Sequence, residues 1–314
     1  MAERFTGWED SGLPPDSPGT VVTVGTFDGV HRGHQDVLAR IGELGRETGL
    51  SSVLVTFEPH PLEVVNPAAA PPLLTIGEEK TEVVAESGIS YLAVVPFTKN
   101  LQRYSPAQFV DEVLRRRFHM RRLVIGYDHG FGRDRAGDVE VMRALGAGRG
   151  FGVEVVDAIS LDGLPISSTL IRRAVAGGDL HRAARALGRL YSLSGVVARG
   201  DQRGRLLGFP TINVGAPPPR KLLPPEGVYA VRAQTPHGAF GGMMNLGPRP
   251  TFGDPATSIE AHLFGETGDL YGAHVRVEIV ARLRDTRRFP DAAALVAQLQ
   301  EDAAHARRAL TGLC

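Results

Sequence analysis

The sequence is short of several features that would place it in common protein classes. Its 314 residues include one cysteine, which excludes an internal disulfide and suits a reducing compartment. Lysine plus arginine and aspartate plus glutamate both number 35, so no excess charge favours nucleic acid or a membrane surface. No run approaches the roughly 20 apolar residues of a membrane span, and the N-terminus has no apolar core of signal-peptide length. We therefore expect a cytoplasmic protein without nucleic-acid or membrane partners.

The chain also lacks the two best-known phosphate-binding patterns. No Gly-x4-Gly-Lys-Ser/Thr P-loop occurs. The alternating glycines of residues 146–152 follow a helical stretch and precede a strand, which reverses the order that a dinucleotide-binding motif requires. Any nucleotide site must therefore be built from other segments.

The length of the chain and its apolar content of 42% suggest two domains with ordinary cores. Strand-like runs that alternate with helical stretches predict an α/β domain with a parallel, Rossmann-like sheet over residues 1–187. These runs are residues 21–24, 52–57, 91–95, 123–125 and 153–156. Arg121 and Arg122 are expected to continue a solvated helix end after Arg115–Arg117.

The pattern changes in residues 188–314, where strands follow one another without helices between them. The runs are residues 193–198, 228–233, 240–245, 259–264 and 275–283, and a helix over 292–310 closes the chain. This pattern predicts an antiparallel β-barrel with a terminal helix, whose Leu295, Val296, Leu299 and Ala303 face inward. The sequence leaves the oligomeric state open.

The stretch Gly25–Gln35 joins the first strand to an amphipathic helical pattern and places His31 and His34 at the helix start. Backbone N–H groups and the positive end of the helix dipole favour a phosphate there. Two imidazoles can add hydrogen-bond donors to the same phosphate chain. A zinc site is a weaker interpretation, because zinc needs three or four ligands.

Three later segments also follow strands, so we expect them at the same edge of the sheet. Residues 58–61 hold two prolines, which fix a turn, and residues 126–137 form a glycine-rich loop with Asp128, Arg133 and Arg135. In residues 166–172, Ser168 and Thr169 open a helix, where they cap it or hold a phosphate together with Arg172.

In the second half, the chemistry lies in residues 200–213. Gly200 and Gly204 belong to a glycine-punctuated loop whose backbone amides can approach a phosphate. Thr211 and Asn213 are two residues apart, so their side chains share one face of an extended segment. A hydroxyl and an amide oxygen suit Mg²⁺. The alternative is a hairpin with small polar residues.

The first-half segments resemble those of the nucleotidyltransferase superfamily. Gly25, Phe27, Asp28 and Gly33 with the two histidines match Gly-x-Phe-Asp-Gly-x-His-x-Gly-His. The three segments that contain residues 58–61, 126–137 and 166–172 resemble, in this order, the family segments Thr-Phe-x-Pro-His-Pro, Gly-x-Asp-Phe-x-Phe-Gly and Ile-Ser-Ser-Thr-x-Ile-Arg. The resemblance implies that these segments contact nucleotide and flavin, with His31, His34 and Arg172 as catalytic residues. His129 departs from the pattern.

The second-half segments resemble riboflavin kinase. Thr211 and Asn213 match its Gly-x-Pro-Thr-x-Asn motif, which implies a magnesium–ATP role, and Asn245 opens a second segment that lines the site. Glu260 matches the family's catalytic glutamate, which accepts the proton of the flavin hydroxyl. His262 is expected on the opposite face or in a structural role. Gly265-Glu266 stand where the family has Asp-Phe.

Together, the motifs resemble the bacterial bifunctional riboflavin kinase/FAD synthetase family over roughly residues 20–310. The resemblance implies two reactions: phosphorylation of riboflavin by ATP to FMN, and transfer of AMP from a second ATP to FMN, giving FAD and pyrophosphate. The substrates and products would be riboflavin, FMN, FAD and ATP, with Mg²⁺ as cofactor. Alternatives are an FMN adenylyltransferase alone, a non-catalytic flavin-binding regulator, and a nucleotidyltransferase for a sugar or lipid headgroup.

Overall fold

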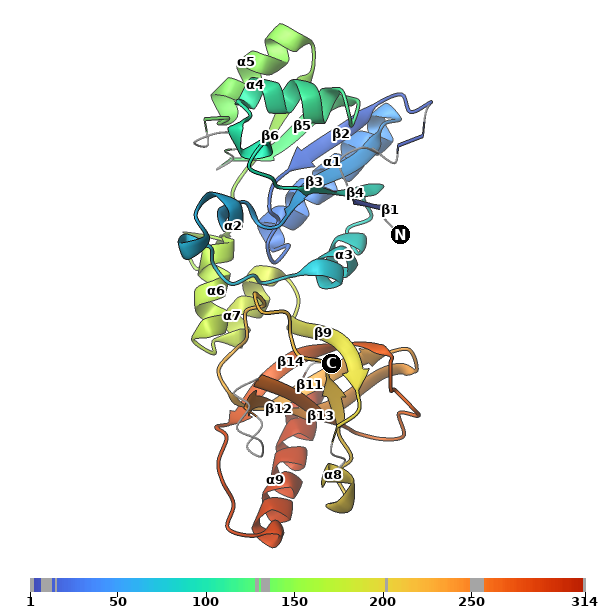
Figure 1. Cartoon of the computed structure of the whole chain (residues 1–314), viewed down its shortest axis with the longest axis vertical. Helices are drawn as coiled ribbons and strands as arrows, with labels where there is room; N and C mark the ends of the chain where they lie inside the picture. The colour runs from blue at the N-terminus through green and yellow to red at the C-terminus, as the bar shows by residue number, and fades with distance from the viewer. Residues whose placement is uncertain are drawn as a thin grey trace. The chain divides into compact units, whose positions relative to one another are not determined.

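The computed structural model describes residues 3–6, 13–14, 16–127, 130, 136–200, 203–248 and 257–312 (Figure 1). The chain divides into two compact units, Met1–Ser168 and Thr169–Cys314. No helix in the described part of the chain is long and apolar enough to cross a membrane. The division by contacts groups the two helices before the barrel with the second unit, and a domain boundary at residue 187 stays a prediction.

The first unit is built on a six-stranded sheet in the order β1-β4-β3-β2-β5-β6, in which every neighbouring pair is parallel. The predicted α/β fold is confirmed. The strands are β1 (Glu3–Thr6), β2 (Thr20–Val24), β3 (Ser51–Glu58), β4 (Tyr91–Pro96), β5 (Met120–Gly126) and β6 (Gly152–Val156). The helical segments are α1 (Arg32–Thr48), α2 (Pro61–Val65), η1 (Pro67–Ala69), α3 (Gly77–Ala85), η2 (Leu101–Arg103), α4 (Pro106–Gln108), η3 (Phe109–Arg115) and α5 (Val139–Arg149).

Helices cover both faces of this sheet because its strands alternate between two apolar faces. Val21, Leu54 and Leu92 pack against α1 and α3 on one face, in a single buried cluster. Val22 and Val53 belong to a second cluster with η2, η3 and α5 on the other face. Every residue of β2 is buried, as a central parallel strand requires.

The strand order reverses at β2, and this reversal locates a binding crevice. From β2 the chain proceeds through β3 and β4 on one side, and β5 and β6 then lie on the other side. In open α/β sheets, ligands bind at the carboxyl ends of the strands beside such a reversal. The loop that leaves β2 is the histidine segment, so the topology brings it to the crevice.

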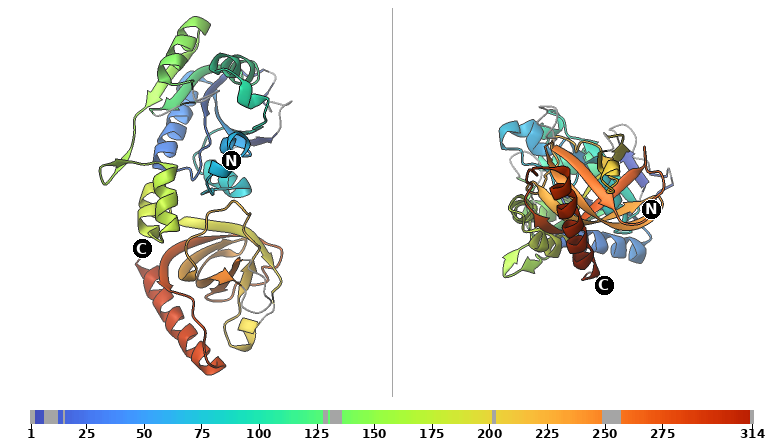
Figure 2. Two further views of the ribbon diagram at one scale, coloured as in Figure 1. Left: turned by 60° about the vertical axis from the view of Figure 1, so that its left-hand side comes forward. Right: turned by 90° about the horizontal axis from the view of Figure 1, so that it is seen from below.

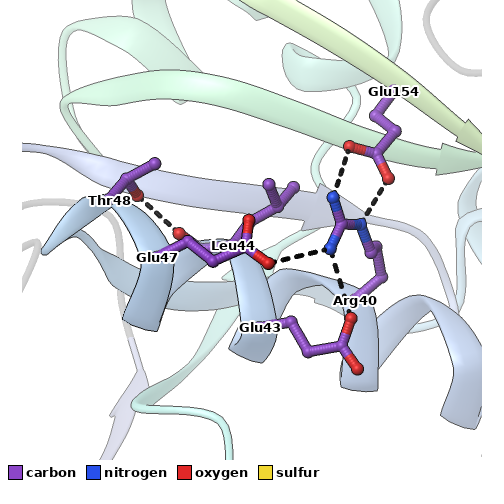
Figure 3. A network of polar contacts seen from close by, with 6 residues as sticks. All are labelled: Arg40, Glu43, Leu44, Glu47, Thr48 and Glu154. Carbon is purple, nitrogen blue, oxygen red and sulfur yellow. Dashed lines mark hydrogen bonds and ion pairs between the residues drawn. The ribbon is translucent and has the colours of Figure 1, made fainter.

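Helix α1 is joined to the edge strand β6 by an arginine that meets three carboxylates (Figure 3). Arg40 donates to both oxygens of Glu154 on β6, at 2.5 and 3.2 Å, and also pairs with Glu43 and Glu47 on its own helix. Hydrogen bonds to Glu154 and then Glu43 raise the pKa of Arg40. This network fixes the helix that begins with the two histidines against the sheet.

Two local predictions differ from the structure. Arg121 and Arg122 are exposed residues of β5 and not part of a helix end, because the strand already begins at buried Met120 and its pairing with β2 shifts register at this point. The segment around Ser168 does not follow the last sheet strand directly, since the short pair β7 (Ser160–Leu161) and β8 (Leu164–Pro165) lies between.

The second unit is a closed barrel in the order β10-β13-β12-β11-β14-β9, with every neighbouring pair antiparallel. This confirms the predicted barrel and terminal helix. The strands are β9 (Tyr191–Ala198), β10 (Ile212–Val214), β11 (Gly227–Thr235), β12 (Gly238–Pro248), β13 (Thr257–Leu263) and β14 (His274–Arg284). The helices are α6 (Ser168–Ala176), α7 (Leu180–Leu187), α8 (Arg203–Leu206) and α9 (Ala292–Thr311).

Helix α9 lies across the outside of the barrel and contacts β11, β12 and β14 (Figure 2). The predicted apolar stripe is only half-buried, although Leu299 and Ala303 join the small apolar cluster beneath the helix. The most buried side chains of α9 include a polar one, Asp302, which is 1% exposed. Its carboxylate accepts three hydrogen bonds from Arg284 of β14, the shortest of 2.7 Å. An ion pair therefore fixes α9 to the barrel.

We expect Asp302→Ala to destabilise the second unit, because it leaves the Arg284 guanidinium largely buried without its carboxylate. Removing one partner of a buried pair costs about 3–5 kcal/mol, and the partial exposure of Arg284 places the expected loss near the lower end. Urea unfolding followed by circular dichroism measures the change. Glu301→Ala, at the exposed neighbouring position, is the control and should change stability by less than about 0.5 kcal/mol. Equal stability of the two variants would contradict this account.

Candidate active sites

The loop between β2 and α1 is held in an uncommon backbone conformation. Phe27 and Val30 have φ angles of 45° and 42°, and Gly29 between them has a φ of 81°. Phenylalanine and valine adopt positive φ only when the surrounding structure imposes it. Phe27 and Val30 are buried in the core beneath α1, which supplies that constraint.

Asp28 is the centre of this constraint. Its side chain is 1% exposed, and its Oδ1 accepts hydrogen bonds from the backbone N–H groups of Leu74 and Thr75, at 2.8 and 3.2 Å. The hydroxyl of Thr75 in turn accepts a hydrogen bond from the N–H of Gly29, and the hydroxyl of Ser168 donates to the Asp28 carbonyl. Asp28 therefore positions the loop through the backbone.

The two histidines lie together at the start of α1. His31 is the N-cap residue, and its Nδ1 accepts a hydrogen bond from the N–H of His34 at 3.3 Å. The two imidazoles stack with their centroids 3.6 Å apart, and the ring of Phe27 stacks on His34 at 4.5 Å. Gly33 stands between the histidines, at the helix start that the sequence predicted.

Burial lowers the pKa of His34 well below its usual value of 6.5, and the charges of His31 and Lys80 act in the same direction. The imidazole of His34 is therefore neutral at pH 7. Its Nδ1 is buried and has no hydrogen-bond partner within the described residues. A neutral imidazole at a helix start can donate one hydrogen bond to an anion but adds no charge.

The other predicted residues of the first site fall in four groups. Gly25 follows β2, and its N–H donates to the Val55 carbonyl. Thr169 and Arg172 lie on α6 in the second unit, where the Arg172 guanidinium donates to the Thr169 hydroxyl at 3.2 Å. Asp128, Arg133 and Arg135 lie outside the described residues. The proline turn after β3 caps α2, since His60 accepts from the N–H of Leu62.

In the barrel, the strand register brings three predicted residues into one row. Glu260 of β13 is paired with Asn213 of β10 on one side and with Asn245 of β12 on the other. Directly paired residues of neighbouring strands project from the same face of a sheet. Ile259 and Ala261 are buried in the barrel interior, so Glu260 and its two neighbours face outward.

The loop before β10 packs tightly on this row. A Cβ atom at Gly200 would come within 2.6 Å of the Asn213 side-chain carbon, so a larger residue there would displace the Asn213 amide. At Gly204, a Cβ atom would meet the Phe209 carbonyl and lie 3.4 Å from the Thr211 hydroxyl oxygen. Both glycines are therefore required by close contact with the segment that carries Thr211 and Asn213.

His262 lies on the same face of β13 as Glu260, so the expectation of an opposite face is wrong. The two residues are separated by two positions, which is the period of a strand. The expected structural role is supported by its contacts: Nδ1 is 2.7 Å from the Pro210 carbonyl, and the ring meets Phe209 and Phe264 edge to face. His262 thus joins β13 to the loop before Thr211.

The oxygen atoms around Glu260, from this row and from Thr211, suit Mg²⁺ better than Zn²⁺. No group of three or more His, Cys, Asp or Glu side chains in the described part of the chain is arranged to hold a metal. Thr211 and Asn213 offer a hydroxyl and an amide oxygen beside the half-buried carboxylate of Glu260. Magnesium takes few protein oxygens and completes its shell with water and phosphate.

The residues that hold the loop between β2 and α1 from a distance carry no recognisable signal in the sequence. Leu74, Thr75 and Lys80 lie about fifty residues after the signature, yet they bond to Asp28, Gly29 and the Thr26 carbonyl. Leu74 and Thr75 contact Asp28 through their backbone N–H groups, so these contacts do not require a particular residue type that a sequence pattern could reveal. Lys80 stands in an acidic helix, where it resembles an ordinary surface lysine.

Comparisons with known proteins match both halves of the chain separately. The family model described as FAD synthetase covers residues 13–170, and the model described as riboflavin kinase covers residues 187–310.

Curated relatives match nearly the whole chain. A bifunctional riboflavin kinase/FMN adenylyltransferase of Pseudomonas fluorescens is 38% identical over 94% of both chains. The protein of the same description from Bacillus subtilis is 35% identical over 94% of this chain and 93% of its own. Among solved structures, a protein of Streptococcus pneumoniae described as a macrolide-efflux protein aligns with a TM-score of 0.81 at 26% identity, over 95% of this chain and 97% of that one.

The lowered pKa of His34 predicts a pH dependence of stability. Because the imidazole has a lower pKa in the folded chain, the unfolded chain binds more protons below about pH 6.5. The free energy of unfolding should fall as the pH drops below that value, by at most about 1.4 kcal/mol per pH unit from this group. Urea unfolding between pH 7 and 5 measures the slope, and His34→Gln should reduce it. An unchanged slope in the variant would contradict a neutral, buried His34.

Proposed function

The chain belongs to the bifunctional riboflavin kinase/FMN adenylyltransferase family, and we propose how its residues divide the two reactions. The enzyme phosphorylates riboflavin with ATP to give FMN, and transfers AMP from ATP to FMN to give FAD and pyrophosphate. We infer that residues 1–187 carry the adenylyl transfer and residues 188–314 the kinase reaction. The observation that carries this proposal is the coincidence of each family match with one of the two polar constellations.

The first site fits a reaction that depends on positioning and charge. The FMN phosphate is already an anion, so its attack on the α-phosphorus of ATP needs no strong base. The N–H groups at the start of α1 and the imidazoles of His31 and His34 would bind the phosphate chain. Ser168, Thr169 and Arg172 are further candidates to hold it, and Gly25, Phe27 and Gly33 shape the loop.

The barrel row fits phosphoryl transfer to a hydroxyl. The flavin hydroxyl is a poor nucleophile while protonated, and Glu260 on the outer face of β13 would accept its proton as the γ-phosphoryl group arrives. The backbone of the loop with Gly200 and Gly204 would bind phosphate oxygens. Asn245, paired with Glu260, would line the flavin side of the row.

ATP is the co-substrate of both reactions. We propose that Thr211 and Asn213 hold Mg²⁺, which would neutralise phosphate charge in the kinase site. A cytoplasmic location stays a prediction from the single cysteine.

The alternatives considered from sequence are less well supported. Residues 187–310 match riboflavin kinase. Neither a lone adenylyltransferase nor a flavin-binding regulator would use kinase activity in this part of the chain. A nucleotidyltransferase for a sugar or lipid headgroup explains only the first unit. Riboflavin, ATP and Mg²⁺ incubated with the purified protein should give FMN first and FAD later, as separated by chromatography.

Substitutions at the two sites should separate the activities. His31→Asn removes the imidazole but keeps a side-chain oxygen that can cap α1, so we expect FAD formation to fall at least about a hundredfold while FMN formation is unchanged. Glu260→Gln should do the reverse, with FAD still formed from added FMN. Initial rates with riboflavin or FMN as substrate measure both. Loss of both activities in either folded variant would refute the two-site assignment.

The close contact at Gly200 gives a second test of the kinase site. Gly200→Ala should displace the Asn213 side chain and raise the Mg²⁺ concentration needed for half-maximal FMN formation. Gly148→Ala, at a position where an added Cβ meets no atom within 4 Å, is the matched control. An unchanged magnesium dependence in Gly200→Ala would argue against Asn213 as a ligand.

A further inference from the structure

Lys80 of α3 contacts the loop between β2 and α1, although it lies far from that loop in the sequence. Its Nζ donates a hydrogen bond of 2.9 Å to the carbonyl oxygen of Thr26, the residue before Phe27. The hydroxyl of Thr56 donates to the same oxygen at 3.1 Å. Thr26 thus has two donors, and the ammonium is not needed to satisfy its carbonyl.

The ammonium of Lys80 has more N–H donors than its one hydrogen bond uses. An ammonium carries three N–H groups, and one is used by Thr26. Within the residues that the structure describes, no carboxylate lies at ion-pair distance from it. Burial lowers the pKa of Lys80, while the carboxylates of Asp28 and Glu58 act in the opposite direction. A partly buried cation with unused donors is costly unless an anion completes its surroundings.

Lys80 and His34 contact two successive residues of the loop, Thr26 and Phe27. The amine bonds to Thr26, and the imidazole of His34 stacks on the ring of Phe27. The two groups lie close enough for the charge of Lys80 to lower the pKa of His34. Since His34 is neutral, it gives a phosphate chain no positive charge, and Lys80 is an adjacent group that can supply one.

We propose that Lys80 is a catalytic residue of the N-terminal site, where its ammonium binds the phosphate chain of ATP and stabilises the departing pyrophosphate. The inference rests on the proposed adenylyl transfer. A phosphate oxygen of FMN forms a bond to the α-phosphorus, and the bond from that phosphorus to the oxygen bridging to the β-phosphorus breaks. The bonding electrons leave with pyrophosphate. Lys80 stays protonated and transfers no proton, and its charge offsets the negative charge that develops on the leaving group.

Lys80→Gln tests this role because it keeps an N–H donor for Thr26 and removes the charge. We expect kcat/KM for FAD formation from FMN and ATP to fall about 10²–10³-fold, as for loss of one charge-stabilising donor. FMN formation from riboflavin by the same sample should be unchanged and serves as an internal control. Lys80→Arg, which keeps the charge, should retain more activity than Lys80→Gln.

Thr56→Val is the matched control for anchoring alone, since it removes the other hydrogen bond to the Thr26 carbonyl without a change in charge. It should retain FAD formation within about tenfold of wild type. If Thr56→Val and Lys80→Gln lose activity equally, or if Lys80→Gln is as active as wild type, the proposal is overturned. A wild-type protein that makes no FAD from FMN would instead refute the proposed adenylyl transfer.

A measurement on the wild-type protein covers the case in which Lys80→Gln does not fold. NMR of lysine side chains, labelled with ¹⁵N at Nζ, should show the Lys80 signal shift when magnesium pyrophosphate is added. The pKa of Lys80 should rise in that complex, because a bound anion favours the charged amine. An unchanged Lys80 signal at saturating pyrophosphate would contradict direct binding.

Discussion

The first unit depends on one buried carboxylate. Asp28 accepts two backbone hydrogen bonds from residues that precede α3, and this clamp holds a loop in which Phe27 and Val30 have positive φ. Such a backbone persists only where its surroundings fix it. The start of α1, with the stacked histidines, follows directly from this loop. The N–H groups at this helix start, where we propose that phosphate binds, are thereby fixed in position.

The second unit depends on strand register in the same way. Asn213, Glu260 and Asn245 form a row only because β10 and β12 pair with β13 at those positions. A slip of one residue would turn Glu260 into the barrel interior, where burial of an unpaired charge is costly. The ion pair between Asp302 and Arg284 holds α9 over the neighbouring strands.

The two proposed sites differ in their electrostatics, in line with the chemistry proposed for each. In the barrel, a half-buried carboxylate lies between two amides on the outer face of the strands, which suits proton removal from a hydroxyl. In the first unit, the imidazole of His34 is kept neutral, and we propose that Lys80 supplies a positive charge beside it. That arrangement suits a reaction between anions, in which no proton needs to be removed.

Local periodicity and contiguous motifs were enough to predict both fold classes, the positions of the main strands and the two histidines at the start of α1. It also indicated Glu260, Thr211 and Asn213 through short segments. Only the tertiary structure decided that Asp28 binds backbone N–H groups, that His262 shares a face with Glu260, and that Lys80 reaches Thr26. These facts depend on register and on contacts between segments far apart in the chain, which no local pattern records.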